Sequence, residues 1–106
     1  MKLCVIVNTN DPETNWNALR LGNEALSGKH TATIFLLGSG VEMTTIKDRT
    51  FNVAGVLDKF LANGGNLLAC GTCLTQRQRG AGVCSISTMS ELVKTISDSD
   101  KVVSLG

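Results

Sequence analysis

The chain has 106 residues, of which 42% are hydrophobic and 18% charged, and its formal net charge is +1. This length predicts a single domain, residues 1–106, that can bury a substantial core. The near-neutral charge argues against nucleic acid or an anionic membrane surface as a partner, because both require a clustered basic face.

The sequence also lacks the patterns of exported and membrane-spanning chains. The apolar run after Lys2 ends at Asn8, whereas a secretory signal needs roughly 7–15 apolar residues. No window approaches the ~20 apolar residues of a membrane span. We therefore expect a cytoplasmic protein whose thiols are reduced unless they work in catalysis. Those thiols belong to Cys4, Cys70, Cys73 and Cys84.

The first part of the chain reads as a strand, a helix and a second strand. Residues 3–7 form a continuous apolar run, which is typical of a strand buried on both faces of a sheet. A helix is predicted over residues 12–27, with Asp11 as its N-cap and Gly28 ending it. The second strand is predicted over residues 31–37.

A glycine-rich segment, Gly38-Ser39-Gly40, follows the second strand. Such a segment can bind phosphate, but this one lacks the later glycine of a dinucleotide-binding motif and has no Gly-Lys-Ser/Thr. We therefore predict a tight turn and no cofactor. The polar stretch that continues to Thr50 is predicted to be a connecting loop or a short irregular helix.

Further strands and helices complete the chain. An unbroken apolar stripe predicts a helix over residues 51–63. A short buried strand follows over residues 66–70, and residues 72–78 could form a short helix. A short fourth strand is predicted over residues 83–87.

Thr88 and Glu91 form a capping box that begins the last helix, which ends near residue 98 and precedes a final strand over residues 101–105. Alternation of strands and helices predicts an α/β fold with three layers, α/β/α, around a mainly parallel sheet of about five strands. Functional groups in such sheets collect at the carboxyl ends of the strands. Four loops should converge there, at residues 8–11, 38–47, 70–73 and 86–88.

The pair in Cys70-Gly71-Thr72-Cys73 stands where the third strand ends and the short helix begins. A cysteine there faces unpaired N–H groups and the positive end of a helix dipole, which stabilise a thiolate, so we predict a lowered pKa for Cys70. Arg77 and Arg79 could add a positive field. The alternative is a pair of small buried thiols without chemistry.

A metal site or a thioredoxin fold fits the sequence less well. The spare ligands for a metal are Cys84 and His30, and His30 is predicted to lie at the opposite end of the sheet. Zinc would then have three cysteine ligands, one fewer than a closed structural site, so no metal is predicted. A thioredoxin fold would need a cis-proline, and the only proline is Pro12.

The sequence resembles the DsrE/DsrF-like, or YchN-like, family of sulfur-relay proteins over nearly its whole length. Leu68-Ala69-Cys70-Gly71-Thr72-Cys73-Leu74 carries most of the resemblance. Weaker support comes from the opening strand, the helix with Asn17-Ala18-Leu19-Arg20-Leu21, the segment Ile34–Glu42, the Gly64-Gly65 helix end and Ser99–Val103.

The resemblance implies a small α/β/α fold with a mainly parallel five-stranded sheet, for which we expect a flavodoxin-like strand order. It also implies a homotrimer or homohexamer. In relay members a cysteine receives a sulfane sulfur from a donor protein, holds it as a persulfide and passes it to an acceptor protein. Cys70 matches that position through the Ala-Cys-Gly…Leu pattern, whereas counting back from Arg79-Gly80 favours Cys73.

Our main hypothesis is therefore a small sulfur carrier or sulfurtransferase component. Cys70 would hold the persulfide, with Cys73 as a resolving or helper thiol and with support from Gly71, Thr72 and Arg77. Two alternatives stay open: a dithiol oxidoreductase or redox sensor that uses a Cys70–Cys73 disulfide, and a non-enzymatic oligomeric subunit with inert thiols.

Overall fold

Five parallel strands form a single sheet in the order β4-β3-β2-β1-β5 in the computed structural model, which describes all of residues 1–106. The strands are β1 (Lys2–Val7), β2 (Thr31–Leu36), β3 (Asn66–Cys70), β4 (Ser85–Ser87) and β5 (Lys101–Leu105). The predicted parallel, five-stranded α/β sheet is confirmed, with every pairing parallel.

The strand order differs from the flavodoxin-like order 2-1-3-4-5 that we expected. Here β2, β3 and β4 are added one after another on the same side of β1, and only β5 returns to the other side. The rule of right-handed crossovers fixes on which face a helix lies once the direction of the step is known. The rule does not say on which side of the preceding strand the next strand is added. The apolar periodicity of the sequence does not say so either.

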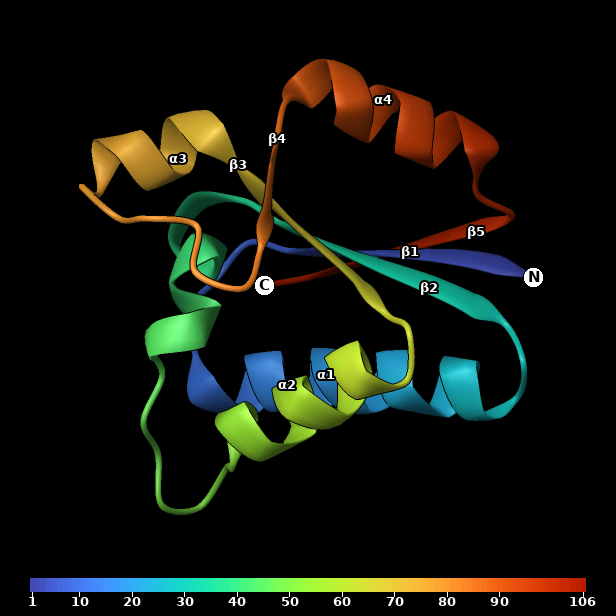
Figure 1. Cartoon of the computed structure of the whole chain (residues 1–106), viewed down its shortest axis with the longest axis horizontal. Helices are drawn as coiled ribbons and strands as arrows, with labels where there is room; N and C mark the ends of the chain where they lie inside the picture. The colour runs from blue at the N-terminus through green and yellow to red at the C-terminus, as the bar shows by residue number, and fades with distance from the viewer.

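The helices form the outer layers that this strand order requires. The first two of the three steps in one direction carry α1 (Pro12–Ser27) and α2 (Val53–Ala62), which lie on one face of the sheet (Figure 1). The return step carries α4 (Met89–Asp98), which lies on the opposite face. The three-layer α/β/α prediction is therefore confirmed.

Local capping explains where these helices begin. The Asp11 carboxylate accepts a hydrogen bond from the Thr14 N–H at 2.9 Å, and the Asn52 side chain caps Gly55 at 3.0 Å. Thr88 accepts from the Glu91 N–H at 3.1 Å, as the capping box predicts, although the Glu91 carboxylate turns to the Ser87 hydroxyl at 3.0 Å.

Two segments depart from the sequence expectation. A 3₁₀ helix, η1 (Gly38–Thr45), replaces the predicted tight turn and part of the following loop. The short helix after β3 is α3 (Gly71–Gln76), which begins one residue earlier and ends two residues earlier than predicted. Both lie beyond the carboxyl ends of the strands, on the left in Figure 1.

The core lies on both faces of the central strands: Ile34 of β2 faces α1, and the next residue, Phe35, points to the opposite face because side chains alternate along a strand. Its fully buried side chains include Phe35, Phe60, Leu19, Ile34 and Leu36. Cys4 in β1 is also fully buried, as expected of a small core residue. None of the helices combines the length and apolar character that a bilayer crossing requires.

Candidate functional site

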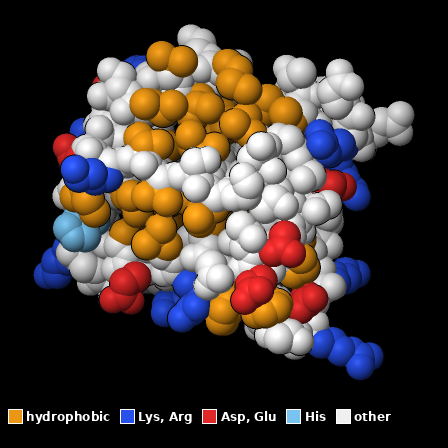
Figure 2. Space-filling model, turned by 180° about the vertical axis from the view of Figure 1, so that it is seen from behind, with side chains coloured by type: hydrophobic (Ala, Val, Ile, Leu, Met, Phe, Trp, Pro, Cys, Tyr) orange, Lys and Arg blue, Asp and Glu red, His pale blue; other side chains and the backbone are white.

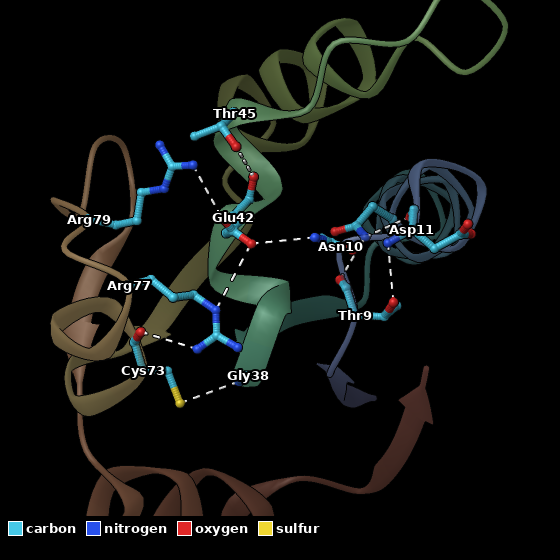
Figure 3. Close-up of polar contacts among 10 residues, drawn as sticks. Thr9, Asn10, Asp11, Gly38, Glu42, Thr45, Cys73, Arg77 and Arg79 are labelled. Atoms are coloured by element: carbon cyan, nitrogen blue, oxygen red, sulfur yellow. Dashed lines mark hydrogen bonds and ion pairs between the residues drawn. The ribbon is translucent and has the colours of Figure 1, made fainter.

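The carboxyl ends of the three central strands lie side by side and bring their loops together. In the register of the sheet, Val7 of β1 lies beside Leu36 of β2, which lies beside Ala69 of β3. The loop after β1, the helix η1 and the helix α3 therefore start next to one another. Polar contacts join all three, and Figure 3 shows them.

Cys70 ends β3 with its side chain in the core. Only 3% of it is exposed, and it belongs to the same apolar cluster as Leu74 and Cys84. Although Cys70 occupies the N-cap position of α3, its sulfur accepts no hydrogen bond from the N–H groups of that helix. The Cys70 sulfur therefore has little solvent access and no N–H donor, because the strand directs this side chain inward.

Cys73 lies one turn further along, on the side of α3 that faces η1. Its side chain is partly exposed, and its Sγ accepts a hydrogen bond from the backbone N–H of Gly38 at 3.3 Å (Figure 3). An N–H donor held against a sulfur favours the thiolate, which is the reactive form. Of the two motif cysteines, Cys73 is thus the one with both access and a donor.

Gly38 suits this position for two reasons. Its φ of +52° lies in the left-handed region, which glycine adopts without strain. A Cβ at this residue would also collide with the Asn8 side chain of the neighbouring loop. The sequence predicted a tight turn at this segment, and its contact with Cys73 follows from the pairing of β2 with β3.

Glu42 contacts several polar side chains near the Cys73 thiol. Its carboxylate lies 3.9 Å from Arg77 Nε and 3.1 Å from Arg79 Nη2, and it accepts a 3.4 Å hydrogen bond from Asn10. Arg77 also donates to the Cys73 carbonyl at 3.4 Å. Arg77 was predicted to support the site, whereas Glu42 and Asn10 were missed, because no sequence pattern links them to the cysteine pair.

The other predicted supporting residues line a shallow groove on the far side of α3. Gly71 and Thr72 border this groove of about 440 Å³ together with Arg79 and Ile86. A Cβ at Gly71 would approach Ile86 Cγ2 to 3.1 Å, so the glycine allows α3 to pack close to β4. Neither cysteine of the motif lines the groove.

The remaining thiols and the histidine lie apart from this site. Burial raises the pKa of Cys84 to about 11 and raises the pKa of Cys4, so both stay protonated near neutral pH. His30 lies at the opposite end of the sheet, where its Nδ1 is 3.1 Å from the N-terminal nitrogen. No three His, Cys, Asp or Glu side chains gather closely enough to hold a metal ion.

Comparisons with known proteins place this geometry in context. The sequence model of the DsrE/DsrF-like family matches residues 1–105. Among solved structures, the YchN protein of E. coli superposes with a TM-score of 0.81 at 23% identity, covering 98% of this chain and 99% of that one. No curated protein matches the sequence.

Two further structures share the fold at lower identity. A conserved protein of unknown function from Bacteroides thetaiotaomicron has a TM-score of 0.79 at 19% identity, covering 97% of this chain and 93% of that one. A protein of unknown function from Methanobacterium thermoautotrophicum has a TM-score of 0.76 at 9% identity, covering 97% of each chain. At these identities the likeness establishes the fold alone.

Proposed function

Because the chain belongs to the DsrE/DsrF-like family, which is associated with sulfur relay, we propose that it is a small sulfur carrier with its persulfide on Cys73. The observation that carries the proposal is the 3.3 Å hydrogen bond from the Gly38 N–H to the sulfur of Cys73, which is a partly exposed residue. The carrier role moves from Cys70 to Cys73 because a sulfur that is exchanged between proteins must be reached, and Cys70 is buried.

The chemistry requires little beyond an accessible thiolate. The Cys73 thiolate attacks the outer sulfur of a donor persulfide, R–S–SH; a new S–S bond forms at Cys73 as the donor S–S bond breaks, and R–S⁻ leaves. An acceptor thiolate then attacks the outer sulfur of the Cys73 persulfide and releases Cys73 as thiolate. The Gly38 N–H stabilises the anion at the start and at the end, so no histidine base is needed.

Sulfur loading tests the proposal directly. The protein is incubated with a cysteine desulfurase and cysteine, or with thiosulfate, and its intact mass is measured. The expected result is a gain of one sulfur atom per chain that is removed by dithiothreitol and maps to the peptide containing Cys73. Absence of any gain with both donors contradicts the carrier function.

A dithiol oxidoreductase is the second candidate function, and the Cys70-x-x-Cys73 spacing across the start of α3 favours it. Both thiols are free in the structure. Mild oxidation of such an enzyme would produce an intramolecular Cys70–Cys73 disulfide with a redox potential in the glutaredoxin or thioredoxin range. Inert thiols are the remaining alternative, and failure of native Cys73 to react with iodoacetamide would establish it.

We further propose that the carrier assembles as a homotrimer or homohexamer in the cytoplasm, where a working thiol stays reduced. The support is an apolar surface over α4 and β5. Only Leu92 of α4 is buried, while Met89 is 54%, Val93 66% and Val102 of β5 41% exposed. Figure 2 shows hydrophobic side chains gathered over this side of the molecule, with charged side chains mostly at its margins.

Val93→Asp is expected to shift the assembly toward monomers in analytical ultracentrifugation, because it puts a charge into the apolar surface. The matched control is Ala54→Asp, which places the same charge on the exposed first turn of α2, on the other face of the sheet. Sedimentation of the wild-type protein as a monomer at micromolar concentration would contradict the proposed assembly. It would leave the proposed carrier role unaffected.

A further inference from the structure

The geometry around Cys73 points to Glu42 as a positioning residue: through Arg77 and Arg79 it holds the Gly38 N–H of its own helix against the Cys73 sulfur. The inference deepens the proposed function, since it concerns the thiol that the proposal makes the carrier. It concerns the reactivity of that thiol, which can be measured whether or not a sulfur is ever loaded.

The polar contacts around Cys73 join two elements, η1 and α3 with the residues that follow it. The N–H donor, Gly38, and the carboxylate, Glu42, both belong to η1. The sulfur acceptor lies on α3, and the two arginines follow directly after that helix. Three polar contacts therefore join η1 to the segment 73–79: the Gly38–Cys73 hydrogen bond at 3.3 Å and the ion pairs of Glu42 with Arg77 at 3.9 Å and with Arg79 at 3.1 Å.

Glu42 is itself held from a third direction. Its Oε1 accepts from Asn10 Nδ2 at 3.4 Å, in the loop after β1 (Figure 3). That loop is fixed in turn by Asn15, which is fully buried and donates to the Thr9 and Asp11 carbonyls at 2.9 and 2.8 Å. The carboxylate thus lies at a junction of the three loops, and 22% of its side chain is exposed.

The arginines could instead act on the sulfur through their positive charge alone. Both, however, lie against the same carboxylate, and Arg77 also donates to the Cys73 carbonyl at 3.4 Å. Much of their charge is therefore offset locally, and their contacts serve to connect the two elements. The two explanations predict opposite effects when the carboxylate is removed.

Simple electrostatics predicts that loss of the negative charge of Glu42 favours the thiolate, because a nearby like charge disfavours an anion. The positioning role predicts the reverse. Without Glu42, η1 loses both ion pairs to the segment after α3, the Gly38 N–H is held less firmly against the sulfur, and the thiolate is stabilised less. The direction of the change therefore decides between them.

The experiment measures the rate of iodoacetamide alkylation of Cys73 as a function of pH, in wild type and Glu42→Gln. Cys4, Cys70 and Cys84 are buried, so the rate in the native protein reports Cys73, which peptide mapping verifies. We expect the midpoint of the profile to rise by about one pH unit and the rate below the midpoint to fall about tenfold. An unchanged or lowered midpoint overturns the inference.

Two further measurements keep the result specific. Glu24→Gln removes an exposed carboxylate from α1, remote from the thiol, and should leave the profile unchanged. In the double variant Glu42→Gln/Arg79→Gln, the loss of Arg79 should add little once its partner is gone, whereas independent effects would add in full. Full additivity therefore also contradicts the positioning role. If no sulfur is ever loaded on Cys73, the carrier function fails while these alkylation results stand.

Discussion

Cys73→Ser is expected to abolish sulfur loading completely, whereas Cys70→Ser should load one sulfur atom per chain as wild type does. Serine keeps the size of the side chain but cannot form a persulfide, so only the residue that receives the sulfur should show total loss. Cys73 is partly exposed and has the Gly38 N–H as a donor, while Cys70 is 3% exposed and has no donor. Intact-mass measurement after incubation with a persulfide donor checks both variants.

The two variants are matched in chemistry but differ in burial. Cys70→Ser introduces a hydroxyl into the core, which costs about 1–3 kcal/mol if the hydroxyl finds no partner. Thermal denaturation of each variant therefore accompanies the loading assay, and Cys70→Ala replaces Cys70→Ser if the latter does not fold. Retained loading in Cys73→Ser would return the carrier role to Cys70, and loss in both variants would favour the dithiol function.

Phe60→Ala is expected to lower the free energy of unfolding by about 3–5 kcal/mol, which is a large part of the stability of a small domain. The Phe60 ring is fully buried where α2 approaches α1 and the start of β3. It occupies the space left by two glycines: a Cβ at Gly22 would lie 2.7 Å from the ring, and one at Gly65 would also collide with it. Neither backbone is expected to collapse far enough to fill the cavity.

Urea denaturation at a fixed protein concentration measures the effect, since assembly of the proposed kind would add to the apparent stability. The matched control is Phe51→Ala. Phe51 is partly exposed and packs against Trp16 with ring centroids 5.3 Å apart, so its loss should cost clearly less. Equal costs for the two substitutions would contradict the packing described for the α1–α2 layer.

Sequence patterns were sufficient for the elements whose ends carry local signals. The helix from Pro12 to Ser27 and the strands β3 and β5 have the predicted bounds, because capping residues, glycines and uninterrupted apolar runs act over a few residues. The position of the cysteine pair at the carboxyl edge followed from the same patterns. The strand order could not be predicted from these patterns, because it depends on how complete layers of helices and strands pack together.

The proposed assignment of the carrier role to Cys73 also could not be made from the sequence. It depends on a contact between residues 35 positions apart, Gly38 and Cys73, and on an ion pair between Glu42 and Arg79. Such contacts arise from the pairing of β2 with β3, which sets η1 beside α3. The sequence correctly predicts that each of these residues lies in or near a loop. It does not show which of them are in contact.

The shortness of α3 has a consequence for local stability around Cys73. A six-residue helix is too short to be stable by itself, and within it only Leu74, 3% exposed, is anchored in the core. Opening this turn therefore breaks few hydrogen bonds, and it can occur while β3 remains paired in the sheet as an independent unit of local unfolding. The free energy of local opening at Cys73 is thus separate from the free energy of global unfolding, and amide hydrogen exchange should be faster in α3 than in β3.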